Sequence, residues 1–173
     1  MRVAMSAHFE KKHNYKVASV NCWVVTVSNG RTEQTDTTGK FICERLKAHQ
    51  HSVSSYTLIK NDTAQITEMA NKLRNDSNVQ AVIFHGGTGL SKKDQTARIL
   101  RTLYDEEING FGELFRMLSY QEIGAYALLS RASAGIINKK LVFSLPGSEN
   151  AVQLAMDKLV IPAINHAVQQ LQK

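Results

Sequence analysis

The sequence has few of the residues that characterise several protein classes. Its 173 residues include two cysteines, Cys22 and Cys43, and only 7% aromatic residues. The cysteines lie far apart and fit no metal-ligand spacing, so we expect buried thiols that act as small hydrophobic side chains, without a redox or metal role. No apolar run approaches the roughly 20 residues that a membrane-spanning helix needs. These absences favour a globular protein with no membrane segment.

The amino-terminal stretch also lacks the features of an export signal. Residues 1–15 contain charged residues and several histidines, with no apolar core and no small-residue cleavage site. We therefore expect a cytoplasmic protein in which residues 1–15 form a flexible arm. A length of this order suits one α/β domain with a sizeable core, so residues 16–173 are predicted to form a single domain.

The chain carries an excess of positive charge. Lysine and arginine (21) outnumber aspartate and glutamate (15), which gives a formal net charge of +6. Such a charge permits a nucleic acid as partner. However, the basic residues are scattered and aromatic residues are few, so neither a basic stripe nor a stacking surface is expected. A small phosphorylated ligand accounts for the sign of the charge equally well, and we expect no nucleic-acid partner.

Strand-like and helix-like hydrophobic patterns alternate through the first hundred residues. The segments with strand character are residues 18–27, 53–59 and 80–84. Each precedes a segment with helical spacing; in the second of these, Ile66, Met69, Ala70 and Leu73 share one helix face. This rhythm predicts βαβ units. We expect an α/β fold, namely a doubly wound three-layer sandwich with a mostly parallel sheet and helices on both faces.

The second part of the chain is less regular. Residues 134–145 have the pattern of two short strands about a polar turn. Ser148 is placed to cap a helix, and Pro162 is expected to restart or kink the final helix. One further helical face is predicted to contain Phe111, Leu114, Phe115 and Leu118.

Residues 86–94, called the glycine loop below, are the strongest candidate for ligand binding. They follow an apolar strand and precede a helix, and they contain Gly86, Gly87, Gly89 and two lysines. Glycine permits φ > 0 and close approach of a ligand, and the start of a helix favours a phosphate. The loop matches neither the P-loop nor the dinucleotide-binding fingerprint. We expect it to bind an anion, with a plain strand-to-helix turn as the alternative.

Asp62 and Asp94 follow strands at the edge where a ligand is expected. In a parallel sheet, ligands bind beyond the carboxyl ends of the strands. Two carboxylates beside phosphates would suit Mg²⁺, which takes few protein oxygens. Each aspartate also fits a capping-box pattern, with Gln65 following Asp62 and Ser91 preceding Asp94. Helix capping and metal or acid–base chemistry therefore both remain open for each.

Other polar residues have less specific interpretations. His85 at a strand end is expected to be a hydrogen-bonded residue rather than a catalyst. Arg116 and Arg131 are expected on solvated faces or at subunit contacts. Residues 35–39 offer candidate helix caps.

Five short motifs follow one another along the chain. They are Gly86-Gly87-Thr88-Gly89, Asp94-Gln95-Thr96, Gly110-Phe111-Gly112-Glu113, Ser130-Arg131-Ala132 and Pro146-Gly147-Ser148. Together they resemble the MoaB/Mog molybdenum cofactor biosynthesis family, and the resemblance extends from about Val17 to Lys173. It implies a doubly wound α/β domain that binds molybdopterin. It also implies a homo-oligomer, a trimer or, for MoaB-type proteins, a hexamer.

The resemblance implies an activity as well. Active members of the family transfer AMP from MgATP to the phosphate of molybdopterin, so ATP and Mg²⁺ are the expected co-substrate and cofactor. The family's functional aspartates, which serve catalysis and hold the metal, fall on Asp62 and Asp94. The pterin- and phosphate-binding positions fall on Ser28, Gly86, Gly87, Thr88, Gly89, Ser91, Pro146, Gly147 and Ser148.

Some positions depart from the family pattern. His85 is bulkier than the usual small residue or threonine, Ser91 stands where threonine is common, and Pro146 is not followed by a second proline. These changes bear on substrate binding and turnover more than on the fold. Two functions therefore follow from the sequence: a molybdopterin adenylyltransferase, or a non-catalytic molybdopterin-binding or assembly protein of the same pathway.

Overall fold

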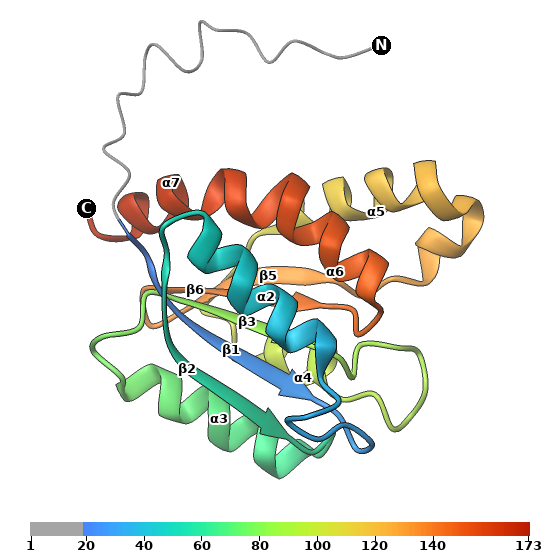
Figure 1. Cartoon of the computed structure of the whole chain (residues 1–173), viewed down its shortest axis with the longest axis horizontal. Coiled ribbons are helices and arrows are strands. Elements are labelled where there is room, and N and C mark those ends of the chain that lie inside the picture. Colours follow the sequence, from blue (N-terminus) through green and yellow to red (C-terminus); the bar gives the residue numbers. More distant parts are fainter. Residues whose placement is uncertain (1–18) are drawn as a thin grey trace, which may run out of the picture.

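A six-stranded sheet forms the centre of the molecule, which a computed structural model describes for residues 19–173 (Figure 1). The predicted arm at residues 1–15 lies outside the described residues. The strands are β1 (Asn21–Val27), β2 (Ser52–Ile59), β3 (Ala81–His85), β4 (Glu106–Glu107), β5 (Ser133–Ile137) and β6 (Lys140–Leu145). They lie in the order β2-β1-β3-β6-β5-β4. Strands β2, β1, β3 and β6 are parallel, whereas β5 and β4 add an antiparallel edge.

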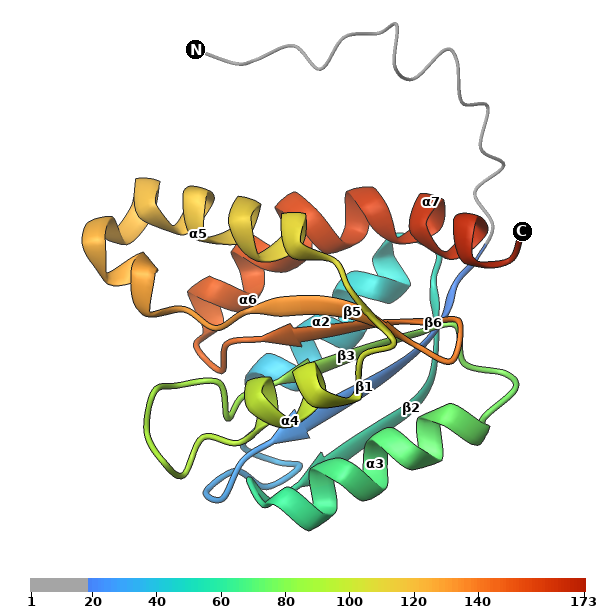
Figure 2. The ribbon, with the colours of Figure 1, turned by 180° about the vertical axis from the view of Figure 1, so that it is seen from behind.

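Helices cover both faces of this sheet, which confirms the predicted three-layer α/β sandwich. The helical segments are α2 (Thr37–Ala48), α3 (Thr63–Asn75), α4 (Thr96–Leu103), α5 (Asn109–Ile123), the 3-10 segment η1 (Gly124–Leu129), α6 (Glu149–Ala155), the π-helical segment η2 (Met156–Val160) and α7 (Ile161–Leu171). Helices α3 and α4 lie on one face, and α2, α5, α6 and α7 lie on the other (Figure 2).

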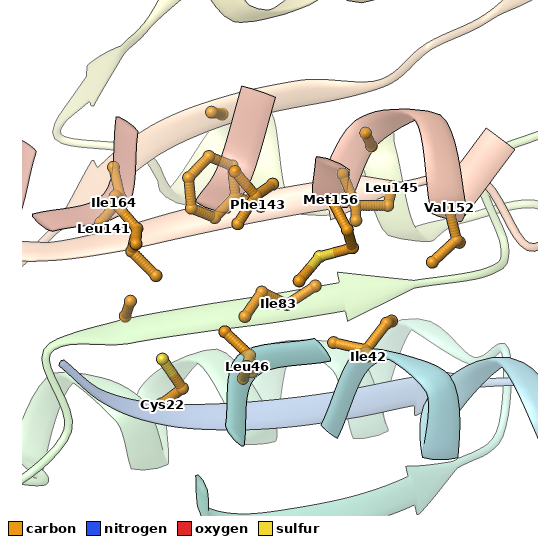
Figure 3. Packing of buried hydrophobic residues seen from close by; sticks show 14 of the residues in the cluster. Cys22, Ile42, Leu46, Ile83, Leu141, Phe143, Leu145, Val152, Met156 and Ile164 are labelled. Atoms are coloured by element: carbon orange, nitrogen blue, oxygen red, sulfur yellow. The ribbon is translucent and has the colours of Figure 1, made fainter. Parts of the chain in front are cut away.

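The alternation of side chains along β3 divides the core into two layers. Ile83 points toward the face that α2, α6 and α7 cover, where it packs near Ile42 and Met156 (Figure 3). Val82 and Phe84 point to the other face, against α3 and α4. The side chains named here, from β3, α2 and the segment after α6, are all fully buried. Burial of each such side chain stabilises the fold by about 1.5–3 kcal/mol, which is why a strand in the middle of the sheet has no polar face.

Three details differ from the sequence-based expectation. Strand β4 and segment η1 have no counterpart in the predicted elements, because β4 has only two residues, both glutamates, and η1 is a short 3-10 turn. Leu114 was predicted to share a helical face with Phe111 and Phe115, but it is 48% exposed, whereas those two residues are buried. Those two residues are four apart and point directly at the sheet, while Leu114 lies at the margin of that helix face.

The parallel arrangement places four loops at one edge of the molecule. The carboxyl ends of β1, β2, β3 and β6 lie side by side, so the loops at residues 28–36, 60–62, 86–95 and 146–148 share that edge (Figure 1). This is the edge at which an open α/β sheet binds its ligand. Within residues 19–173, no helix has the length and apolar character to cross a membrane.

Candidate functional site

Arg131 holds the glycine loop in place. Its Nε donates to the carbonyl oxygen of Thr88 at 3.0 Å, and its Nη2 donates to the carbonyl oxygens of Gly89 and Asp94, the latter at 3.0 Å. One guanidinium thus satisfies backbone acceptors along most of the loop. The sequence did not predict this role of Arg131, because Arg131 lies about forty positions from the loop in the chain.

The first two glycines of the loop have backbone conformations that other residues rarely adopt. Gly86 has φ +90° and Gly87 has φ +64°. A Cβ at Gly86 would lie 2.4 Å from the carbonyl oxygen of Val27. On the other side, a Cβ at Gly147 would lie 3.3 Å from the Cα of Gly86, so the two loops touch through their backbones. Glycine is required at Gly86 for both conformation and space.

A cavity of about 210 Å³ opens beside the glycine loop. One side of it is polar and comes from the loops at the strand ends, with Thr88, Gly89, Ser130, Pro146 and Ser148. The other side comes from α5, η1 and α6. Its residues are Phe115, Ser119, Ile123, Tyr126, Ala127, Leu129 and Ala151. The cavity therefore combines backbone and hydroxyl groups with an apolar wall.

Four of the residues predicted to bind pterin or phosphate line this cavity, namely Thr88, Gly89, Pro146 and Ser148. The other five are placed elsewhere at the same edge. Ser28 Oγ accepts hydrogen bonds from the amides of Gly30 and Arg31, and Ser91 Oγ accepts one from the Lys93 amide. Ser148 is the N-cap residue of α6, as predicted, but its side chain makes no capping hydrogen bond.

Asp94 does not cap the helix that follows it. Helix α4 begins at Thr96, and its N-cap residue Gln95 makes no side-chain capping bond. The Asp94 carboxylate instead lies against Gly89, where a Cβ would be 2.6 Å from Oδ2, and Oδ1 accepts a hydrogen bond from Asn61 Nδ2 at 3.3 Å. The capping-box prediction for Asp94 was therefore wrong; its carboxylate lies next to Gly89, which lines the cavity, although Asp94 itself does not.

Asp62, by contrast, is a helix cap. Its Oδ1 accepts hydrogen bonds from the amides of Ala64 at 2.7 Å and Gln65 at 3.1 Å, at the start of α3. Gln65 completes the arrangement by accepting from the Lys60 amide at 2.9 Å. This capping confirms one of the two interpretations from sequence. The residue whose side chain reaches Asp94 is the preceding one, Asn61.

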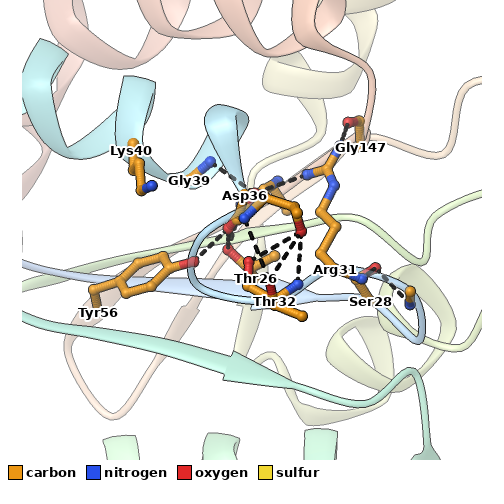
Figure 4. A network of polar contacts seen from close by, with 12 residues as sticks. Thr26, Ser28, Arg31, Thr32, Asp36, Gly39, Lys40, Tyr56 and Gly147 are labelled. Atoms are coloured by element: carbon orange, nitrogen blue, oxygen red, sulfur yellow. Dashed lines mark hydrogen bonds and ion pairs between the residues drawn. The ribbon is translucent and has the colours of Figure 1, made fainter.

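A buried polar network centred on Asp36 lies directly behind these loops (Figure 4). Asp36 Oδ2 accepts hydrogen bonds from the Thr26 and Tyr56 hydroxyls, both at 2.5 Å. Its Oδ1 accepts from the Gly39 amide at the start of α2, and from Arg31 Nη1 at 3.0 Å. The predicted caps at residues 35–39 included Asp36, but no local signal revealed the partners on β1 and β2.

Arg31 connects that network to the loop after β6. While Nη1 donates to Asp36, Nη2 donates to the carbonyl oxygen of Gly147 at 2.9 Å. Gly147 in turn touches Gly86. Arg31 thus fixes the spacing between the first loop and the two loops that border the cavity. This role was not predicted, since it joins residues more than a hundred positions apart.

His85 belongs to the same network, and its imidazole is neutral. Thr26 donates its hydroxyl proton to Asp36, so His85 Nε2 donates to Thr26 Oγ1 at 2.7 Å. Burial lowers the pKa of His85 to about 4, although nearby Asp36 opposes this effect. Burial also acts to raise the pKa of Asp36, but the hydrogen bonds from Thr26, Tyr56 and Gly39 keep it below its usual value. The 3.8 Å approach of His85 to Asp36 is therefore not an ion pair at neutral pH, and the predicted hydrogen-bonded role of His85 is confirmed.

Known proteins resemble this chain over nearly its full length. Residues 23–166 match a family model described as "Probable molybdopterin binding domain". Molybdenum cofactor biosynthesis protein B of Bacillus cereus is 44% identical over 170 residues, covering 98% of this chain and 99% of that protein. A crystal structure of a molybdenum cofactor biosynthesis protein B superposes with a TM-score of 0.88 and 45% identity, over 91% of this chain and 99% of that one. A tungsten cofactor synthesizing protein MoaB from Pyrococcus furiosus superposes with a TM-score of 0.80 and 31% identity, over 90% and 98% of the two chains.

Proposed function

Because this chain belongs to the MoaB/Mog molybdenum cofactor biosynthesis family of molybdopterin-binding domains, we propose that it transfers AMP from MgATP to the phosphate of molybdopterin, in the cytoplasm. The observation that carries the proposal is the cavity beside the glycine loop. Two of the three loops with predicted pterin- and phosphate-binding positions, at Gly89 and at Ser148, line the same cavity as Phe115 and Tyr126, whereas Ser28 does not line it. A flat pterin ring suits the apolar wall, and its phosphate suits the amides and hydroxyls opposite.

The transfer requires an oxygen of the pterin phosphate to attack the α-phosphorus of ATP. The bond from that phosphorus to the oxygen that bridges to the β-phosphate breaks, and diphosphate leaves. The chain's part in such a reaction is to position and neutralise phosphates. Lys92 and Lys93 supply positive charge within the loop, and Arg131 keeps the loop amides in a fixed arrangement.

The side chains near Asp94 fit a magnesium ion held jointly with substrate. Within residues 19–173 no group of three histidine, cysteine, aspartate or glutamate side chains could hold a metal. Mg²⁺ needs no such group, since one or two carboxylates with phosphates and water are usual. Asp94 offers a carboxylate, and the buried Thr96 hydroxyl has no hydrogen-bond partner, whereas the Asp62 carboxylate accepts the amides at the start of α3. A bound Mg²⁺ would supply positive charge that neutralises the triphosphate of the substrate.

Incubation of the purified protein with molybdopterin and MgATP tests this function. We expect an AMP adduct of the pterin and one equivalent of diphosphate to accumulate, as measured by mass spectrometry and diphosphate release. Omission of Mg²⁺ should abolish both products. Pterin binding without any adduct at saturating MgATP would contradict the proposed activity.

That last outcome describes the second candidate function, a molybdopterin-binding or assembly protein without catalysis. Two observations favour it. The polar partner of Asp94 is the neutral side chain of Asn61, and the Asp62 carboxylate already accepts two amides at the start of α3. Under this function, molybdopterin raises the unfolding temperature, and MgATP has no further effect.

We also propose that the protein is a homo-oligomer that uses the surface of α5 and η1. Seven large apolar side chains of these segments are exposed, with Tyr126 and Leu128 at 77% and 70%. The others are Leu114, Met117, Tyr120, Ile123 and Leu129. An apolar surface of this kind marks an interaction site. We expect the Leu128→Glu substitution to shift the protein toward the monomer in sedimentation velocity, whereas Leu90→Glu, an exposed leucine outside this surface, should not.

A further inference from the structure

Asn61 joins three of the loops at the ligand-binding edge. Its Nδ2 donates to Asp94 Oδ1 at 3.3 Å, and its Oδ1 accepts from the Gln95 amide at 3.2 Å. Its own amide donates to Asn29 Oδ1 at 3.0 Å. A single side chain from the β2–α3 loop therefore fixes the end of the glycine loop and the carboxylate within it, while Asp62 caps α3.

Asn61, Asp94 and Thr96 form a small group of oxygen-bearing side chains, called the Asp94 cluster here. A Cβ at Gly87 would lie 2.7 Å from Asn61 Oδ1 and 2.5 Å from Thr96 Oγ1, so both oxygens face the same side of this glycine. The Thr96 hydroxyl is buried and has no hydrogen-bond partner. Oxygen ligands of this type are those that Mg²⁺ prefers.

The amide at Asn61 limits the charge of this cluster. As a donor, Nδ2 stabilises the Asp94 carboxylate without a second negative charge. An aspartate at this position would lose the donor and place two carboxylates in hydrogen-bonding proximity, where they repel each other unless a cation lies between them. In the present arrangement this repulsion does not arise, because Asn61 faces the Asp94 carboxylate with a donor.

We propose that Asn61 positions the Asp94 carboxylate and, as a neutral group, keeps the Asp94 cluster a weak metal site that binds Mg²⁺ together with substrate phosphates. Asn61 is a positioning residue that acts through Asp94. This inference rests on the proposed function, because it assigns Asp94 to a phosphate-bound magnesium ion. It also identifies Asn61 as the position at which the charge of the site is set.

The Asn61→Asp substitution tests the inference without pterin or ATP. Mn²⁺ serves as the probe in place of Mg²⁺, and its free concentration is measured by electron paramagnetic resonance. We expect the variant to bind Mn²⁺ at least about tenfold more tightly than the natural protein, since a second carboxylate raises the ligand charge. Without metal, the variant should unfold at a lower temperature than the natural protein. Added Mn²⁺ should raise the unfolding temperature of the variant by more than that of the natural protein.

Three further variants serve as controls that separate the effect of the added charge from the effect of losing the Asn61 hydrogen bonds. Asn61→Ala removes both side-chain bonds but adds no charge, so its Mn²⁺ affinity should stay within about twofold of the natural protein. Adding Asp94→Asn to Asn61→Asp should cancel the increase in Mn²⁺ affinity, whereas adding Asp62→Asn to Asn61→Asp should preserve that increase. An equal gain in Asn61→Ala, or a gain that survives Asp94→Asn, would overturn the proposal.

The stability of Asn61→Asp is itself informative. A variant that folds only when Mn²⁺ is added supports the proposal, because the cation then separates the two carboxylates. A variant with unchanged Mn²⁺ affinity, or one that stays unfolded at millimolar Mn²⁺, contradicts it. Failure of the AMP-transfer assay leaves these results unaffected, so the two proposals are tested separately.

Discussion

Asp94→Asn is expected to lower the rate of AMP transfer by about 10²- to 10³-fold, while molybdopterin affinity changes by less than about threefold. Removal of one preorganised electrostatic group commonly costs this much in rate. The substitution keeps the shape of the side chain, and the Arg131 contact uses the backbone carbonyl of residue 94. The glycine loop and the pterin contacts proposed for it should therefore persist, while the negative charge that we propose faces the metal is lost.

Single-turnover formation of the AMP adduct measures the rate, and pterin fluorescence measures the affinity. Asp76→Asn is a matched control, because Asp76 accepts the amides of Asn78 and Val79 in a turn at the amino-terminal end of the sheet. It removes the same charge far from the cavity and should leave the rate unchanged. Normal turnover in Asp94→Asn would exclude Asp94 from the reaction.

Asp36→Ala is expected to lower the free energy of unfolding by about 3 kcal/mol, the low end of the range for breaking a buried ion pair, because the Arg31 side chain is 30% exposed. Asp36 is fully buried, and its carboxylate accepts hydrogen bonds from the Arg31 guanidinium, two hydroxyls and the Gly39 amide. The substitution leaves these donors without their acceptor, and it also removes the N-cap of α2.

Urea unfolding at a fixed protein concentration measures this loss. Tyr56→Phe is the graded control, since it removes one of the same hydrogen bonds and should cost only about 1–2 kcal/mol. Equal losses in the two variants would mean that the carboxylate is not the centre of the network. Because Arg31 also binds the carbonyl of Gly147, Asp36→Ala should weaken molybdopterin binding as well.

The sequence was informative wherever structure depends on local periodicity. The spacing of Ile66, Met69 and Leu73 predicted the buried face of α3, because burial follows the 3.6-residue period of a helix. The predicted loops share one edge for a similar reason, since the carboxyl ends of parallel strands must lie together. Strand β4 gave no such signal, because two glutamates at the sheet edge have no apolar pattern.

The site was less predictable because its contacts join distant parts of the chain. Arg131 reaches the glycine loop across about forty positions, with bonds to Thr88 and Asp94. The difference between Asn61 and Asp62 depends on the direction of two adjacent side chains. The helix cap draws Asp62 toward α3 and leaves Asn61 to face Asp94. Spacing in the sequence does not distinguish between such neighbours.

The position of β6 has a consequence for the order in which the protein folds. This strand comes late in the chain, yet it lies in the middle of the sheet and pairs with β3 along its length. During synthesis, β1, β2 and β3 emerge first and leave one long side of β3 without its neighbour. Contacts of high sequence separation form slowly, and unpaired strand edges favour aggregation. The central sheet is therefore completed only after residue 145 has left the ribosome, and until then the nascent chain exposes one edge of β3, the hydrophobic strand that leads into the glycine loop.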